Sequence, residues 1–139
     1  MEAVHRRCQA LKHSIPLIHL DTNFLIDALL PGSAEEAQLV GWLNAGETLG
    51  ISTVAWGEFL CGPISNAAES LARQLLPDTE ALERLDAETA ADLFNRTGRR
   101  AKSFADCCIA ATAIRVSAPL ATSNQADFLP LAAYGLVLA

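Results

Sequence analysis

The stretch LIHLDTNFLI, residues 17–26, predicts a buried strand that passes directly into a helix. Residues 17–20 are a short, mainly apolar run, which is typical of a strand inside a parallel sheet. Asp21, Thr22 and Asn23 come next, and short polar side chains of this kind favour the start of a helix. A strand joined directly to a helix is the repeating unit of α/β folds.

The same alternation continues along the chain. Further strands are expected at 49–52, 81–85, 119–122 and 136–138, with helices at about 33–45, 53–61, 65–76, from 86 onward, and from 103 or 105 to 116. Such an order favours parallel pairing with helices on both faces of the sheet. We therefore predict a three-layer α/β/α sandwich with a five-stranded, mainly parallel sheet, built by residues 17–139 as one domain. Residues 1–16 are predicted to be an N-terminal extension.

The composition limits the possible functions. The chain has 139 residues, 51% of them hydrophobic, which is enough for the core of one domain. Its 10 basic and 16 acidic residues give a net charge of −6. This charge excludes a protein that coats nucleic acid through clustered Lys and Arg alone. It is compatible with an acidic enzyme that binds a cation.

The cysteines and the hydropathy indicate a cytoplasmic protein that has no membrane partner. The four cysteines do not form a C-x-x-C pair, so buried thiols in a reducing compartment are favoured over disulfides or zinc. No apolar run approaches the roughly 18 residues that a membrane-spanning helix needs.

Four acidic residues lie at matching places, after predicted strands or in the helices beside them: Asp21, Glu58, Asp106 and Asp127. Ligands of parallel sheets bind beyond the carboxyl ends of the strands. If strands 17–20 and 119–122 are neighbours, Asp21 meets the segment 122–127. Carboxylates this close cannot all ionise without a cation, and oxygen ligands suit Mg²⁺ or Mn²⁺. Metal-assisted hydrolysis of a phosphodiester is the chemistry that this arrangement favours.

Each acidic residue also has a purely structural interpretation. Asp21 and Asp106 suit helix N-caps, Asp127 suits the cap of a turn, and Glu58 suits an exposed position on a helix. It is less expected that all four structural interpretations hold together, because the four residues occupy matched positions of the fold.

Four segments resemble the ordered motifs of PIN-domain ribonucleases. They are LDTNFLID at 20–27, ISTVAWGEFLCG at 51–62, ADCCIAATA at 105–113 and LATSNQADF at 120–128. The chain length is further similar to that of VapC-type toxins of bacterial and archaeal toxin–antitoxin pairs. This resemblance implies an endoribonuclease that depends on one or two Mg²⁺ or Mn²⁺ ions, forms a homodimer and is inhibited by a cognate antitoxin.

Residue by residue, the resemblance implies that Asp21, Glu58, Asp106 and Asp127 are the catalytic, metal-binding carboxylates. It implies a supporting role in the pocket for Thr22, Asn23, Thr53, Thr122 and Asn124. The chain departs from the family in two places. Residues 1–16 precede the usual first strand, and Ser123 stands where the fourth motif often has Arg, which removes one expected phosphate contact.

A group of basic residues precedes the third motif: Arg96, Arg99, Arg100 and Lys102. We predict that they contact RNA, which is anionic. The alternative is that they only decorate the C-terminal end of a helix, where the helix dipole favours cations. The two interpretations are compatible, and both stay open at this point.

Two other functions fit an acidic pocket in an α/β fold. One is a phospho-acceptor domain like the receivers of signalling systems, which needs paired acids after the first strand and a late Lys; Asp21 stands alone there and no Lys follows Lys102. The other is a PIN-like domain that only binds RNA or protein.

Overall fold

The computed structural model describes residues 17–97 and 103–139. Within them a parallel sheet has the order β2-β1-β3, formed by β1 (Leu17–Leu20), β2 (Thr48–Gly50) and β3 (Leu120–Ala121). The first strand is therefore central, and it pairs with the strand that contains residues 120–121. The segments predicted to carry the first and fourth motifs are neighbours, as their proposed meeting requires.

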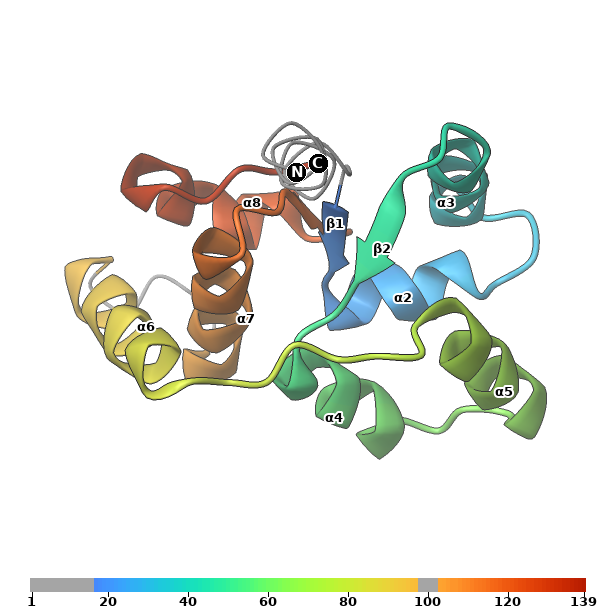
Figure 1. Cartoon of the computed structure of the whole chain (residues 1–139), viewed down its shortest axis with the longest axis horizontal. Coiled ribbons are helices and arrows are strands. Elements are labelled where there is room, and N and C mark those ends of the chain that lie inside the picture. Colours follow the sequence, from blue (N-terminus) through green and yellow to red (C-terminus); the bar gives the residue numbers. More distant parts are fainter. Residues whose placement is uncertain (1–16, 98–102) are drawn as a thin grey trace, which may run out of the picture.

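Seven α-helices surround this sheet in the described residues (Figure 1). They are α2 (Thr22–Ala28), α3 (Ala34–Asn44), α4 (Thr53–Cys61), α5 (Asn66–Leu75), α6 (Arg84–Arg96), α7 (Phe104–Arg115) and α8 (Gln125–Phe128), and a 3₁₀ helix, Leu129–Tyr134, follows. In the view of Figure 1, α6 and α7 lie on one side of the strands, and α2 and α3 lie on the other.

Serine side chains fix where several helices begin. Ser33, Ser52, Ser65 and Ser103 are the N-caps of α3, α4, α5 and α7, and each side chain accepts a hydrogen bond from the backbone N–H three residues on. These bonds satisfy N–H groups that the first helical turn otherwise leaves without a partner. The start of α7 at Phe104 agrees with the prediction.

The prediction of a five-stranded sheet is wrong: the described residues form a three-stranded sheet. The predicted strand 81–85 reduces to one bridge between Glu80 and Ser52, because α6 already begins at Arg84. A capping box of Glu83 and Asp86 starts this helix, so Asp86 is its third residue and not its cap. The predicted strand 136–138 likewise reduces to a bridge between Leu138 and Leu120.

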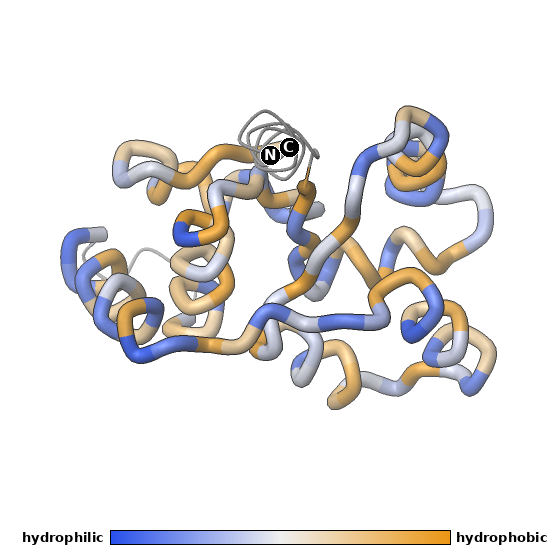
Figure 2. Tube along the Cα trace, viewed as in Figure 1, coloured by the Kyte–Doolittle hydropathy of each residue, from blue (hydrophilic) through white to orange (hydrophobic). Residues whose placement is uncertain are grey.

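The core is centred on α7, whose seven consecutive residues 107–113 are all buried. Figure 2 shows that hydrophobic residues predominate along α7, whereas α6 also carries many hydrophilic ones. Phe24, Phe59 and Phe128 pack into the same core from α2, α4 and α8. The first turn of α7, which carries Asp106, leads directly into this buried stretch. In the described part of the chain, no helix has the length and apolar character needed to cross a membrane.

His19 is a polar residue of the central strand whose ring lies against Gly50 of β2. A Cβ atom at position 50 would lie 2.9 Å from two atoms of the ring, so a larger residue there would displace the imidazole. Burial lowers the pKa of His19, with a smaller opposing effect from Glu80, and the ring is therefore neutral at pH 7.

Candidate functional site

Asp21 occupies the point where β1 ends and α2 begins, and its side chain is only 2% exposed. It stands at the N-cap position of α2, but its carboxylate makes no capping hydrogen bond. Instead, Oδ2 accepts a hydrogen bond of 3.0 Å from the hydroxyl of Thr122, which follows the neighbouring strand β3. The Thr122 oxygen in turn accepts a hydrogen bond of 3.0 Å from the backbone N–H of Asn124. The fourth motif thus orients the carboxylate of the first.

The surroundings of Asp21 raise its pKa from 3.8 to about 6. Burial is the largest cause, and the negative charges of Asp106 and Glu58 add to it. Hydrogen bonds from Thr122 and from the backbone of Thr22 oppose the rise, because they stabilise the ionised form. A buried carboxyl that titrates close to neutrality is a frequent property of functional sites.

Glu58 reaches this site from α4. Its side chain is exposed, and its Oε1 accepts a hydrogen bond of 3.2 Å from the hydroxyl of Thr22 on α2. The start of α4 is set by Ser52, whose side chain accepts a hydrogen bond from Ala55. The cap therefore fixes the helix register that turns Glu58 toward α2.

Asp106 reaches the site from the first turn of α7. It is the third residue of the helix, and its backbone N–H donates to the Ser103 side chain at 3.1 Å. The N-cap is therefore Ser103, so the structural interpretation of Asp106 as a cap does not apply. Its influence on the Asp21 pKa places its charge close to the end of β1.

The structure places the remaining predicted site residues around this group. Asp127 lies on α8, partly buried, and it is not among the carboxylates whose charge raises the Asp21 pKa. Asn124 precedes α8, and Asn23 is exposed on α2. Thr53 faces another segment: its oxygen accepts a hydrogen bond from the backbone N–H of Leu82 at 3.3 Å.

One of the predicted RNA-contacting residues, Arg96, lies in the described part of the chain. It is in the last turn of α6, where its side chain is exposed and forms an ion pair of 2.8 Å with Asp92. Its position therefore agrees with the helix-end interpretation. Arg99, Arg100 and Lys102 lie outside the described residues, as does the predicted extension 1–16.

The donor atoms of this site suit Mg²⁺ or Mn²⁺, since Asp21, Glu58 and Asp106 all offer carboxylate oxygens. Within residues 17–97 and 103–139, however, no three Asp, Glu, His or Cys side chains are grouped so that they could hold an ion by themselves. Mg²⁺ retains several waters and binds through one or two carboxylates together with substrate phosphates, so it needs no complete protein cage. The residues present therefore fit such an ion.

Sequence reasoning assigned no role to Asp27, the last residue of the first motif. Its Oδ2 accepts a hydrogen bond of 2.8 Å from the hydroxyl of Ser123, the position at which the family often has Arg. Asp27 and Ser123 thus attach the 122–124 turn to α2. The sequence signal was that the first motif ends in an acid, Asp27, while the fourth motif has Ser123 at the position where the family often has Arg.

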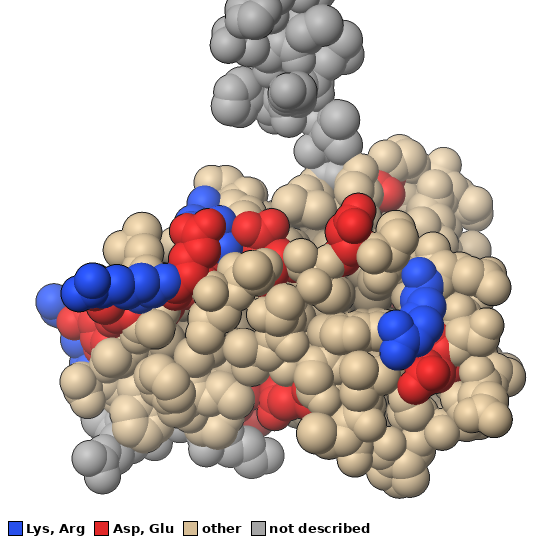
Figure 3. Space-filling view, turned by 60° about the horizontal axis from the view of Figure 1, so that its bottom comes forward, with Lys and Arg blue, Asp and Glu red and all other residues tan. Residues whose placement is uncertain are grey.

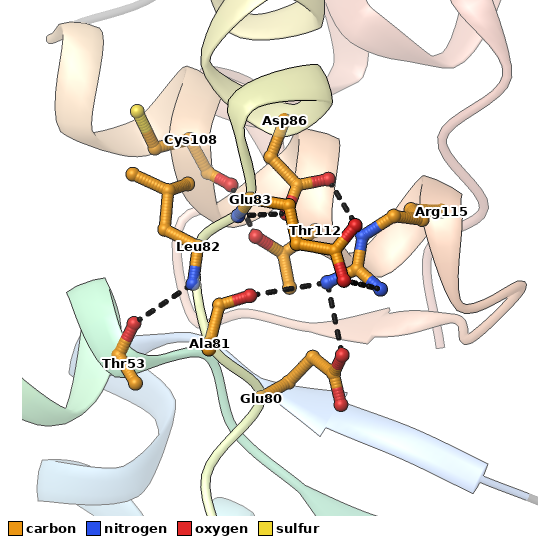
Figure 4. Close-up of polar contacts among 9 residues, drawn as sticks. All are labelled: Thr53, Glu80, Ala81, Leu82, Glu83, Asp86, Cys108, Thr112 and Arg115. Carbon is orange, nitrogen blue, oxygen red and sulfur yellow. Dashed lines mark hydrogen bonds and ion pairs between the residues drawn. The ribbon is translucent and has the colours of Figure 1, made fainter.

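Sequence reasoning also missed a cluster around Arg115 at the end of α7 (Figure 4). The guanidinium donates to Asp86 at 2.8 Å, to Glu80 at 2.9 Å and to the carbonyl of Ala81 at 3.1 Å, and Glu83 lies 3.5 Å away. These contacts raise the pKa of Arg115, chiefly through Asp86. No sequence signal joins residues that lie about 30 positions apart, and the cluster braces the start of α6 against α7.

Several solved structures share this fold. One from Rickettsia felis, VapBC2 bound to a promoter DNA fragment, aligns with a TM-score of 0.70 and 18% identity over 88% of this chain and 97% of that chain. VapBC-1 from nontypeable Haemophilus influenzae aligns with a TM-score of 0.67 and 22% identity over 88% and 96% of the two chains. A toxin–antitoxin complex from Klebsiella pneumoniae aligns with a TM-score of 0.61 and 26% identity over 80% and 89%.

The family comparison assigns the chain more directly. No curated protein matches it. Residues 18–132, which include all four proposed motifs, match the PIN domain. The resemblance predicted from the sequence is therefore confirmed, and a receiver-like phospho-acceptor has no support. The chain belongs to the PIN-domain family.

Proposed function

We propose that this protein is a metal-dependent endoribonuclease and the toxin of a toxin–antitoxin module. One observation carries the proposal: Asp21 is buried at a strand end beside the charges of Glu58 and Asp106. Among the described residues, no Lys or Arg forms an ion pair with it. Membership of the PIN-domain family gives this arrangement its chemical context.

Asp21, Glu58 and Asp106 would hold Mg²⁺ or Mn²⁺, one or two ions, with Asp127 as the fourth carboxylate. When bound, such an ion lowers the pKa of a water molecule and offsets the charge of the scissile phosphate. The residues of the chain prepare the site for it. The hydroxyl of Thr122 orients the Asp21 carboxylate, and the hydroxyl of Thr22 orients that of Glu58.

The substrate and partner assignments rest on the family and its solved members. RNA as the substrate follows the family resemblance, with the basic group from Arg96 to Lys102 as its proposed contact. The structures from Rickettsia felis and Klebsiella pneumoniae are a VapBC complex and a toxin–antitoxin complex, and they support an antitoxin partner. A homodimer and a cytoplasmic location complete the proposal.

The test is cleavage of a single-stranded RNA by the purified protein with Mg²⁺ or Mn²⁺. We expect cleavage by the wild type, and a loss of at least a hundredfold in Asp21→Ala and Asp106→Ala, because both remove a carboxylate that would bind the ion. Glu88→Gln, which removes a charge from the exposed face of α6, is the matched control and should retain activity.

Full activity of these two variants, or of the wild type in EDTA, would contradict the proposal. RNA binding without turnover in the presence of either ion would instead favour the PIN-like domain that only binds. Expression without an antitoxin should halt cell growth, and Asp21→Ala should restore it.

A further inference from the structure

We propose that a second cavity, separate from the carboxylate site, binds an organic cation carried on an apolar stem. The cavity has a volume of about 360 Å³, and Leu17 and Thr48, the first residues of β1 and β2, line it. Asp21 and Thr122 follow the opposite ends of their strands. The inference is therefore independent of the proposed nuclease activity.

The inner end of the cavity is formed by His19, which is 3% exposed. Its ring makes no hydrogen bond or ion pair with any described residue. Yet within the described chain, no fully buried side-chain nitrogen or oxygen lacks a partner. The ring nitrogens are therefore not completely enclosed, and His19 lines the cavity. A neutral imidazole offers one donor and one acceptor there, and Gly50 leaves the space that the ring occupies.

The charges around the cavity select a cation. Asp78 and Glu80 line it, and among the described residues that line it there is no Lys or Arg. Glu80 is partly offset by Arg115, with which it forms an ion pair of 2.9 Å. Asp78 has no ion pair with any residue in the described ranges. On the face shown in Figure 3, basic side chains lie toward the two ends, and acidic side chains are exposed between them. With Glu80 already paired to Arg115, the unpaired carboxylate of Asp78 favours a cation over an anion at the cavity.

The walls of the cavity select an apolar stem. Leu17, Leu49 and Leu75 line it from β1, β2 and α5, and Leu43 of α3, which is 43% exposed, lies at its rim. A volume of about 360 Å³ is near the lower end for ligand sites, which suits a short alkyl chain with one charged head group. An alkylammonium or alkylguanidinium ion has this form, whether it is a free small molecule or the side chain of a Lys or Arg on a partner.

The test is an NMR titration of the full chain that follows the ring signals of His19 and the amide signals of Thr48 and Thr79. n-Butylammonium and n-butylguanidinium are the probes, and 1-butanol and butyrate are controls with the same stem. We expect saturable shifts with the two cations and no saturation with butyrate or butanol. An absence of shifts with the cations, or equal shifts with all four compounds, would overturn the proposal.

Two variants locate the binding. Asp78→Asn should weaken binding of the cations about threefold, the effect of removing one exposed charge partner. The matched control is Asp92→Asn on α6, which should leave binding unchanged. His19→Phe keeps a flat ring and removes both nitrogens, so the amide shifts should be lost while the protein stays folded. Unchanged affinity in both Asp78→Asn and His19→Phe would overturn the proposal.

A further arm of the titration distinguishes the two sources of the cation. A short glycine peptide with a single central Arg carries the same guanidinium on a main chain. Binding of this peptide as tightly as n-butylguanidinium would assign the cavity to a side chain of a partner protein. Binding of the free cations alone would assign it to a small molecule.

Discussion

Two carboxylates are almost fully buried in the described protein, and they differ in whether a cation compensates their charge. Asp86 is 1% exposed and accepts hydrogen bonds from Arg115 and from the backbone of Glu83. Asp21 is 2% exposed and has the hydroxyl of Thr122 in place of a cation. The pKa of Asp21 is raised to about 6 as a result of its burial and its acidic neighbours.

The difference separates a structural acid from a proposed metal ligand. A buried charge is tolerated when it is paired and hydrogen-bonded, as Asp86 is. Asp21 keeps a buried charge that only an external cation can compensate, which costs stability in the absence of that cation. Burial alone therefore does not identify the candidate site of this fold. The absence of a basic partner within the described chain does.

The largest effect on stability is expected when the buried Asp86 loses its cationic partner Arg115. Arg115→Met keeps the apolar stem and leaves Asp86 buried without its cation, so the free energy of unfolding should fall by about 3–5 kcal/mol. Urea denaturation at pH 7 measures this change. A loss below about 1 kcal/mol would show that Asp86 does not depend on Arg115, and the contrast with Asp21 would disappear.

A change of the opposite sign in the free energy of unfolding is expected at Asp21, which has no cationic partner in the described chain. A folded-state pKa of about 6, against 3.8 for an ordinary carboxyl, makes ionised Asp21 about 3 kcal/mol less stable in the folded protein. Folded Asp21 holds its proton more tightly than unfolded Asp21, so this residue lowers stability as the pH rises from about 4 to 6. Asp21→Asn should therefore raise the free energy of unfolding by up to about 3 kcal/mol at pH 7.5 in EDTA.

This gain should vanish at pH 4, where the folded wild type already carries the proton. Thermal unfolding of both proteins across this pH range measures the effect. If Mg²⁺ stabilises the wild type and not Asp21→Asn, the assignment of Asp21 as a ligand is strengthened. Equal stability of the two proteins at both pH values would contradict the raised pKa.

A smaller effect is expected from the hydroxyl that holds Asp21. Thr122→Val removes a hydrogen bond to a charged group, which is worth about 2 kcal/mol. Because that bond lowers the pKa of Asp21, the variant should titrate above pH 6. A carbon-13 NMR titration of the Asp21 carboxyl measures this shift, and Thr122→Ser should restore it. A pKa unchanged in Thr122→Val would show that the hydroxyl does not orient the carboxylate.

The smallest effect concerns the turn that carries Thr122. Ser123→Ala removes the hydrogen bond to Asp27 and should lower the free energy of unfolding by about 1 kcal/mol. Urea denaturation measures this change. The exposed Ala126→Gly of α8 is not a suitable control, because glycine itself weakens a helix. A loss in Ser123→Ala as large as that in Arg115→Met would contradict this order of effects.

The sequence predicted the parts of this molecule that depend on local patterns. The segment 17–26 predicted a strand followed by a helix, and the strand–helix alternation predicted a parallel sheet, whereas the central place of the first strand comes from the structure. Capping chemistry predicted the starts of α3 and α7 within a residue or two. The position of Asp21 beside the fourth motif followed from the rule for strand ends.

The parts that failed depend on distant contacts or on competition between elements. A strand at 81–85 was lost because Glu83 and Asp86 start a helix there, a competition that hydropathy does not resolve. The pairing of Arg115 with Glu80 and Asp86 joins segments far apart in the chain, and no local pattern predicts it. The direction of the Thr53 hydroxyl, toward Leu82, depends on the same segment.

The hydrogen bond between Thr122 and Asp21 joins residues that lie 101 positions apart. The ribosome therefore synthesises the acceptor, Asp21, early and the donor, Thr122, late. Until residues 120–122 leave the exit tunnel, the central strand lacks one neighbour and Asp21 lacks the hydroxyl that orients it. If the protein is the toxin proposed here, we expect the site to be completed only at the end of its own synthesis. A chain that ends before Thr122 would lack the hydroxyl that orients Asp21 and the strand β3 that pairs with β1.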